Sequence, residues 1–145
     1  MPPVRFITKT RLPQPRSDVL RRARLLGFLH QEVDKRLVLV CAGAGYGKTT
    51  LLVDFAHEVS FPVCWYTLDE ADGDPRVFFD YLLLSLRQRF PEFGRQAEAL
   101  LSSLSDVASE VNSVVACLVN EIQSGSRTTS SWYWTTTTGW TPATP

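Results

Sequence analysis

An apolar run that passes directly into a glycine-rich loop constrains the fold of this 145-residue chain more than any other feature. Residues 37–50 read LVLVCAGAGYGKTT. Residues 37–41 have the continuous apolar pattern of a strand buried on both faces of a parallel sheet. Gly43, Gly45 and Gly47 have no Cβ, so the backbone can turn its N–H groups toward a bound polyphosphate. The stretch therefore predicts a phosphate-binding loop.

The residues after the last glycine predict how such a loop would hold a nucleotide. A helix that begins at Lys48 would direct its free N–H groups and its partial positive charge toward the phosphates. Lys48 would reach the β- and γ-phosphates, the Thr49 hydroxyl would be a ligand of Mg²⁺, and Thr50 would lie near the α-phosphate. The complete set of predicted nucleotide-binding residues is Gly43, Ala44, Gly45, Tyr46, Gly47, Lys48, Thr49 and Thr50.

One residue departs from the usual pattern of these loops. The pattern G-x-x-x-x-G-K-[ST] begins with glycine, and this chain has Ala42 at that position. Alanine is a tolerated variant there, and the alternative is a glycine-rich turn that carries a lysine by chance. The context favours the loop, because an apolar strand pattern precedes it and an amphipathic helix pattern follows it. The apolar positions of that helix are Leu51, Leu52, Phe55, Ala56 and Val59.

Length and composition limit the possible classes of protein. With 44% hydrophobic residues, the chain is long enough for one domain with a sizeable core. Fifteen basic residues balance fifteen acidic ones, so overall charge gives no reason to expect binding to nucleic acid or to a membrane. No apolar run approaches the ~20 residues of a membrane span, and we expect a cytoplasmic protein. Cys41, Cys64 and Cys117 are expected to be reduced and buried, and His30 and His57 to be surface or packing residues.

The chain before the loop divides into an arm and a helix. Residues 1–16 are expected to form an extended arm that docks on the rest of the chain, and residues 17–123 a partial nucleotide-binding domain. Ser17 looks like the N-cap of a helix that runs to about Val33. Its polar face carries Arg21, Arg22 and Arg24. We expect most of this face to be solvated, with one arginine available to a nucleotide.

A second apolar run, residues 61–68, predicts a second buried strand and hence a βαβ unit with a parallel sheet. The ligand site would lie at the carboxyl ends of the strands, where four carboxylates follow: Asp69, Glu70, Asp72 and Asp74. They could act on Mg²⁺ or water, or they could form a polar turn and the cap of a helix that begins at Pro75. The second interpretation is favoured, because none of them ends an apolar strand as a Walker B aspartate does.

The remainder of the chain predicts helices and then a change of character. Apolar residues with helical spacing predict helices over residues 75–90, 93–104 and 108–122, the last of which should pack on the sheet. Residues 124–145 contain one charged residue, eight threonines and three of the four tryptophans. We expect them to be a disordered, low-complexity tail. The predicted fold is α/β, a P-loop NTPase-like parallel sheet flanked by helices, incomplete because its third strand is missing.

Three segments in order give the chain a resemblance to a known family. They are TKTRLPQPRSDVLRRARLLGFL, LVCAGAGYGKTTLL and CWYTLDEADGDPRVFFDYL. Over residues 6–122 the sequence resembles the N-terminal ATP-binding domain of MalT-like transcriptional regulators of the LuxR type, which are STAND-class P-loop ATPases related to the AAA ATPases. The resemblance implies ATP or ADP with Mg²⁺ as cofactors and places residues 11–22 near the adenine. It also implies a nucleotide-dependent switch that self-associates, and binding to DNA only through C-terminal domains that this sequence does not contain.

The resemblance also shows what this sequence lacks. The family has an apolar strand ending in Asp-Asp after the helix that matches residues 111–123, and no such strand is present here, so hydrolysis is not expected and no catalytic residue is assigned. Two alternative functions remain open. One is a small P-loop kinase-like phosphotransferase, although a substrate base and a lid arginine are not identifiable. The other is an inert truncated fragment.

Codon arithmetic suggests an origin for the tail. Tryptophan is encoded only by TGG, tyrosine by TAY and threonine by ACN, so the run from Trp132 to Thr135 fixes most of its underlying bases. Starting each codon one base earlier gives Leu/Met/Val, Val, Leu and Asp. The shifted frame thus reads as an apolar strand ending in aspartate. We therefore interpret residues 124–145 as a frameshifted translation of the missing strand, against the alternative of a low-complexity or cloning-derived tail.

Overall fold

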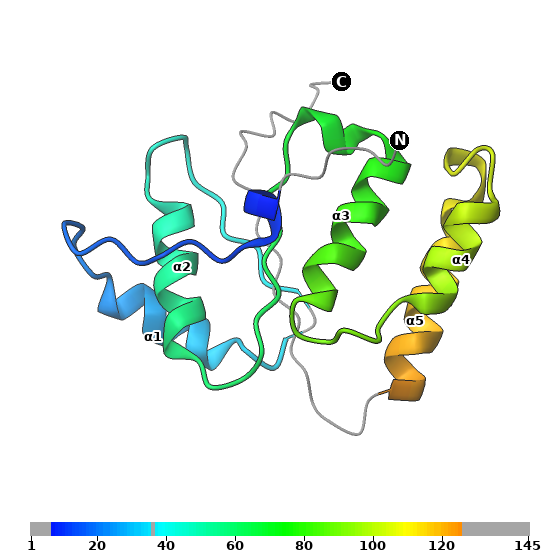
Figure 1. The fold of residues 1–145 in the computed structure, drawn as a ribbon. Helices are drawn as coiled ribbons and strands as arrows, with labels where there is room; N and C mark the ends of the chain where they lie inside the picture. The colour runs from blue at the N-terminus through cyan, green and yellow to red at the C-terminus, as the bar shows by residue number, and fades with distance from the viewer. Residues whose placement is uncertain (1–6, 36, 126–145) are drawn as a thin grey trace.

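The structure is a computed structural model, and it describes residues 7–35 and 37–125. Within these ranges the chain forms five α-helices and three short 3₁₀ helices (Figure 1). In chain order they are η1 (Ile7–Thr10), α1 (Ala23–Gln31), α2 (Lys48–Glu58), η2 (Glu70–Gly73), α3 (Pro75–Arg87), α4 (Arg95–Ser103), η3 (Ala108–Glu110) and α5 (Val111–Gly125).

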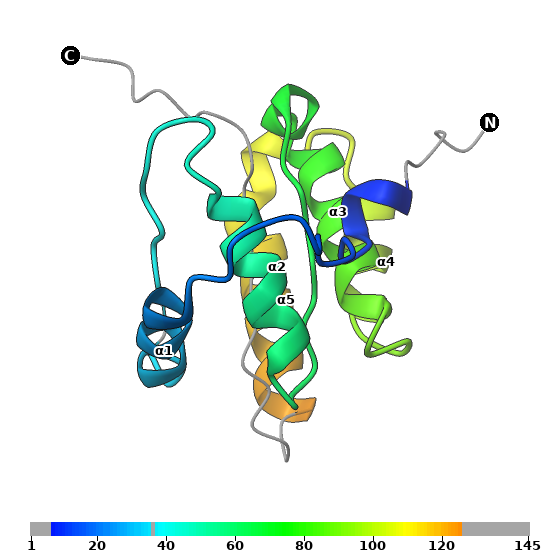
Figure 2. The ribbon, with the colours of Figure 1, turned by 90° about the vertical axis from the view of Figure 1, so that its left-hand side faces the viewer.

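The helices fall into two groups with separate cores. In Figure 1, α1 and α2 lie on one side, and α3, α4 and α5 lie on the other. The extended stretch 61–68 runs between α2 and α3 in both Figure 1 and Figure 2. The core of the α1–α2 region consists of Leu26, Leu29, Leu51 and Phe55. Its small size follows from the helices themselves, because each offers one apolar stripe to a single helical neighbour.

The α3–α5 region has the larger core. Described residues that are fully buried there come from all three helices and from the extended stretch, and include Cys64, Tyr66, Phe79, Tyr81, Leu82, Leu83, Leu86, Ala97, Leu101, Val107, Val114 and Leu118. The turn before α4 is packed closely against this core. Gly94 has φ 77°, and a Cβ at that position would come within 2.2 Å of Leu83 Cδ2, so only glycine fits.

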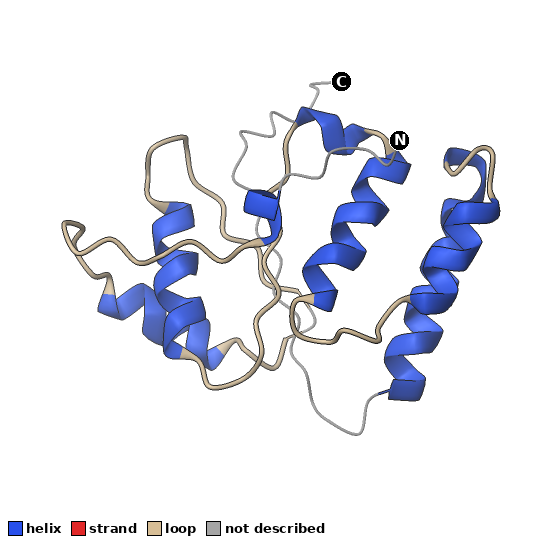
Figure 3. Ribbon diagram, viewed as in Figure 1, coloured by secondary structure: helices blue, strands red, loops and turns tan. Residues whose placement is uncertain are grey.

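The predicted α/β fold is wrong: the described residues contain no β-strand (Figure 3). Residues 37–41 and 61–68, predicted as strands, are irregular in conformation. A strand needs a neighbouring strand to pair its backbone groups, and an apolar run does not provide one by itself. Leu37 and Leu39 are 72% and 75% exposed, so the first run is not buried on both faces either. The third strand was predicted to be missing, with residues 124–145 as its frameshifted translation. Of these, residues 126–145 lie outside the described residues.

The N-terminal part also differs from the prediction. Residues 7–10 form η1 and are not extended, and α1 begins at Ala23, so Ser17 is not its N-cap. The Asp18 carboxylate, expected in the first helical turn, accepts hydrogen bonds from the Arg16 guanidinium. The docking of the arm is confirmed, because the Thr67 N–H donates to the Lys9 carbonyl oxygen at 2.8 Å.

The four later helices are confirmed within a few residues of their predicted bounds. Helix α2 begins at Lys48, and α3 begins at Pro75 behind the Asp74 cap. Helix α5 packs against α4 and not on a sheet, with Val114 fully buried and Val115 42% exposed. The helix continues to Gly125, and the predicted tail from residue 126 lies outside the described residues.

The cysteines and histidines are partly as expected. All three cysteines are free, but Cys41 is exposed, contrary to the prediction that all are buried. Burial raises the pKa of the Cys64 thiol to about 11, so this thiol stays protonated at neutral pH. His30 and His57 are exposed, as predicted for surface residues. None of the described helices combines the length and the apolar character that a membrane crossing requires.

Candidate functional site

The glycine-rich loop leads directly into the N-terminus of α2. Gly45 has φ 79° and Gly47 has φ 74°, so two of the three predicted glycines adopt the left-handed conformation that other residues avoid. Gly47 is also the N-cap of α2, and no side chain caps the helix at this end. The first-turn N–H groups are therefore available to an anion, and the partial positive charge of an 11-residue helix acts on the same space.

Two cations lie on the loop. The Lys48 ammonium donates to the carbonyl oxygens of Ala42 and Gly43, at 2.7 and 2.8 Å. The Arg22 guanidinium donates to the Tyr46 carbonyl oxygen at 2.7 Å, and one of its nitrogens lies 3.1 Å from where a Cβ at Gly47 would be. Of the three arginines on the predicted basic face, Arg22 thus contacts the loop. Both cations are positioned by carbonyl oxygens, which attract them more weakly than a phosphate would.

An apolar cavity of about 270 Å³ adjoins the loop. Its lining comes from α1, from the irregular residues 38–42, and from the loop and α2. The residues are Arg22, Leu25, Phe28, Leu29, Val38, Leu39, Val40, Cys41, Ala42, Tyr46, Lys48 and Leu51. The predicted site residues Tyr46 and Lys48 thus face the cavity and the loop together. The lining is mostly aliphatic and aromatic, as is common for cavities that accept the flat part of a ligand.

The remaining predicted site residues lie at the beginning of α2 or in the loop turn. Ala44 and Gly45 form the exposed tip of the turn, and Thr49 and Thr50 occupy the first turn of α2 and are partly buried. Gly43 is close to the Tyr46 ring, which a Cβ would approach at 3.1 Å. The predicted residues 43–50 are therefore continuous in space as well as in sequence, from the loop turn into the first turn of α2.

The acidic turn after the second apolar run has a structural role. Asp69 caps η2 by accepting from the Ala71 N–H, and Asp74 caps α3 by accepting from the N–H groups of Arg76 and Val77. Asp72 accepts from the Lys9 ammonium at 2.9 and 3.0 Å and from the Tyr66 hydroxyl at 2.7 Å. The favoured interpretation of this cluster as a turn and helix cap is confirmed.

Sequence reasoning missed the Lys9–Asp72 pair, which joins residues 63 positions apart. Burial alone would raise the pKa of Asp72, but hydrogen bonds from the Asp69 N–H, the Tyr66 hydroxyl and Lys9 hold it below its usual range. Lys9 also lies 4.7 Å from the centre of the Tyr81 ring. The pair fastens η1 to η2 and the α3 region. The arm of residues 1–16 carries Arg5, Arg11 and Arg16 as well as Lys9, so the sequence did not single out Lys9.

The described residues offer Mg²⁺ one predicted ligand, the Thr49 hydroxyl. No group of three or more His, Cys, Asp or Glu side chains in the described ranges could hold a metal ion. The carboxylates of Asp69, Asp72 and Asp74 already cap helices or pair with Lys9. Binding of Mg²⁺ at Thr49 therefore stays a prediction.

Comparisons with known proteins find similarity to parts of much longer proteins. No protein-family model matches the chain. It is 31% identical to "Serine/threonine-protein kinase PknK" of Mycobacterium tuberculosis over 118 residues, which are 79% of this chain and 10% of that protein. It is 40% identical to "HTH-type transcriptional regulator MalT" of Serratia proteamaculans over 80 residues, 55% of this chain and 9% of that protein. For MalT of Yersinia pestis, identity is 34% over 93 residues, 64% of this chain and 10% of that protein.

The chain thus spans about a tenth of the length of the curated relatives it matches. The resemblance to MalT-like regulators is confirmed as a similarity of one segment. The stretch matched by PknK and the stretch matched by MalT overlap, because together they exceed the length of this chain. One segment is therefore similar to parts of two proteins whose names give different activities.

Proposed function

We propose that this chain is a nucleotide-binding segment of a MalT-like transcriptional regulator, and that the loop 43–50 holds the phosphates of ATP or ADP. In that role the segment would act as a nucleotide-dependent switch. The observation that carries the proposal is the loop itself: two left-handed glycines lead into an uncapped helix N-terminus that also carries two cations. N–H groups, helix dipole and cations together form an environment suited to a polyphosphate.

The cavity beside the loop supports a nucleotide over a free phosphate. A ligand whose phosphates contact Lys48 and the first turn of α2 could place its base among Leu25, Phe28 and Tyr46. Inorganic phosphate would leave this apolar lining in contact with water. The proposal therefore assigns the base to α1 and the phosphates to α2.

The comparisons support a binding role more than a catalytic one. One segment is similar to parts of both a regulator and a protein kinase. A function that the two have in common would explain this most simply. Phosphate transfer to a protein is named for only one of the relatives, and the proposed nucleotide binding does not require it. A kinase-like activity and turnover of ATP are not part of the proposal.

Calorimetric titration of wild-type protein with ATP and with ADP, each with Mg²⁺, tests the proposal. Lys48→Ala should weaken binding by about tenfold to a hundredfold, because a charge-assisted hydrogen bond contributes roughly 1.5–3 kcal/mol. Lys35→Ala is the matched control: it removes an exposed lysine outside the loop and should leave the affinity unchanged. Circular dichroism should show the same helix content in all three proteins.

Two outcomes would overturn the proposal. Equal affinities of wild type and Lys48→Ala would place the nucleotide elsewhere on the chain. An absence of binding heat in a folded wild-type protein would favour the inert fragment.

A further inference from the structure

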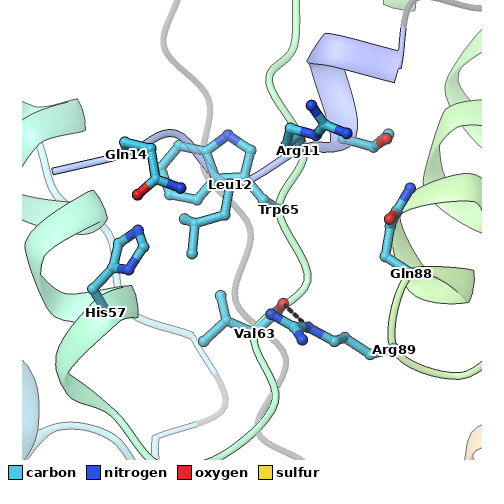
Figure 4. A pocket seen from close by; sticks show the side chains of 9 residues that line it. Arg11, Leu12, Gln14, His57, Val63, Trp65, Gln88 and Arg89 are labelled. Carbon is cyan, nitrogen blue, oxygen red and sulfur yellow. Dashed lines mark hydrogen bonds between the residues drawn. The ribbon is translucent and has the colours of Figure 1, made fainter.

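A second cavity lies away from the loop, at the other end of α2. It has a volume of about 420 Å³ and is shown in Figure 4. The stretch 11–14, the last turn of α2, the extended stretch and the residues after α3 contribute to it, through Thr10, Arg11, Leu12, Gln14, His57, Val63, Trp65, Gln88 and Arg89. Lys48 begins α2 and His57 lies in its last turn, so about 14 Å of helix separate the two sites.

Positive charge dominates this cavity. Arg11 and Arg89 line it from two different elements, and none of its lining residues is an aspartate or a glutamate. The C-terminal ends of α2 and α3 are nearby, and each contributes a partial negative charge of about half a unit. Two full guanidinium charges exceed this sum, so the arginines leave the cavity with about one net positive charge.

The polar groups around the cavity are positioned by contacts between elements. The Arg89 Nε donates to the Val63 carbonyl oxygen at 3.4 Å, a bond drawn in Figure 4. His57 Nε2 lies 2.9 Å from the Pro13 carbonyl oxygen, a contact that joins α2 to the stretch 11–14. Gln14 and Gln88 add amide groups from opposite sides of the view. The cavity is therefore held together by several elements of the fold and does not depend on one loop.

The rest of the lining is apolar. Val63 and Trp65 are buried, and Leu12 lines the cavity with them. The Trp65 Nε1 donates to the Thr67 hydroxyl at 2.9 Å, so the polar atom of the indole is already paired. The cavity thus combines guanidinium groups, which bind carboxylates through two parallel hydrogen bonds, with an aromatic and aliphatic floor.

We propose that this cavity binds a small organic acid, a carboxylate carried on an apolar group. The carboxylate contacts the Arg89 guanidinium, which the Val63 carbonyl oxygen positions, and the apolar part lies on Leu12, Val63 and Trp65. The volume is within the range of natural small-molecule sites. Because the site joins the stretch 11–14 to α2 and α3, its occupant would stabilise the contact between the two helical regions.

Trp65 provides a direct probe of the cavity. Trp132, Trp134 and Trp140 are the other three tryptophans of the chain, so replacing each of them by phenylalanine leaves Trp65 as the only one. This protein is titrated with cyclohexanecarboxylate at constant ionic strength, and its emission is recorded with excitation at 295 nm. We expect a saturable change in Trp65 emission. Cyclohexanecarboxamide, which has the same shape and no charge, should bind at least ~10-fold more weakly.

Single substitutions locate the binding. In the same background, Arg89→Gln should weaken binding of the carboxylate by ~10-fold or more, while Arg24→Gln, which removes an exposed arginine outside the cavity, should not. Circular dichroism and thermal unfolding verify that each variant is folded. Equal affinity for acid and amide would overturn the proposal, as would unchanged affinity in the folded Arg89→Gln variant or no saturable emission change.

Discussion

The α1–α2 region and the α3–α5 region differ in how deeply their helices are buried. Among the described residues, four fully buried side chains form the first core and twelve form the second. The first region also has the most exposed apolar residues, among them Phe28, Leu37 and Leu39. Since stabilisation by burial is roughly proportional to the apolar area removed from water, the α3–α5 region should dominate the stability of the chain.

The region with the smaller core also contains the nucleotide-binding candidate. Loops that bind ligands are commonly found in the less stable parts of a protein, where local opening costs little free energy. The loop 43–50 follows this pattern, because residues 43–46 are exposed and residues 47–50 are only partly buried. The α3–α5 region therefore provides the framework of the fold, and a bound ligand would increase stability most in the α1–α2 region.

Of the tests of this comparison, substitution of a matched pair of leucines should change the free energy of unfolding most. Leu101 in α4 and Leu26 in α1 are both 2% exposed, so they differ in surroundings and not in burial. Leu101→Ala should lower the free energy of unfolding by about 3–4 kcal/mol, because its cavity is enclosed by a large and rigid core. Leu26→Ala should cost about 2 kcal/mol, because the small cluster can close partly around the gap. Urea unfolding followed by circular dichroism measures both.

Hydrogen exchange separates the two leucine variants further. Leu101→Ala should accelerate exchange throughout α3–α5, and Leu26→Ala only in α1 and α2. If Leu26→Ala were as costly as Leu101→Ala and accelerated exchange everywhere, the chain would unfold as one unit and the comparison would be wrong.

The Lys9–Asp72 pair gives a smaller, pH-dependent test. The pKa of Asp72 is lower in the folded protein than in the unfolded chain, so its contribution is present above about pH 4 and is lost as the pH falls through the folded value. Asp72→Asn should cost about 2 kcal/mol at pH 7, and the difference from wild type should shrink toward pH 3. Thermal or urea unfolding between pH 7 and pH 3 measures it.

Asp18→Asn is the matched control for this experiment. Asp18 pairs with Arg16, and both side chains are exposed, so the stability of this variant should follow that of wild type at every pH. A constant difference between Asp72→Asn and wild type across the pH range would show that Asp72 contributes through packing and not through its charge.

Local chemistry explains what could be predicted from the sequence. Helix α3 was predictable because Asp74 and Pro75 form a cap and a first turn within neighbouring residues. The loop was predictable for the same reason, since glycines at positions 45 and 47 lead directly into Lys48. Arg22 was predictable only as one of several arginines, because its contact with Tyr46 joins residues 24 positions apart.

The failures concern structure that depends on distant partners. Residues 37–41 have the composition of a strand, but a strand also needs a neighbour that pairs with its backbone, and that neighbour is not encoded in the run itself. The N-cap predicted at Ser17 was wrong, since α1 begins only at Ala23. The cavity around Arg11 and Arg89 could not be predicted, since its lining comes from four separate parts of the chain.

Hydrogen exchange with and without ATP and Mg²⁺ tests the central claim most directly, because it reports on both regions in one experiment. We predict slower exchange in residues 43–52, where the phosphates would occupy free N–H groups of α2, and unchanged exchange in α4 and α5. Lys48→Ala should remove this protection. Protection confined to the α3–α5 region, or exchange that ATP leaves unchanged throughout the chain, would contradict the assignment of nucleotide binding to the glycine-rich loop.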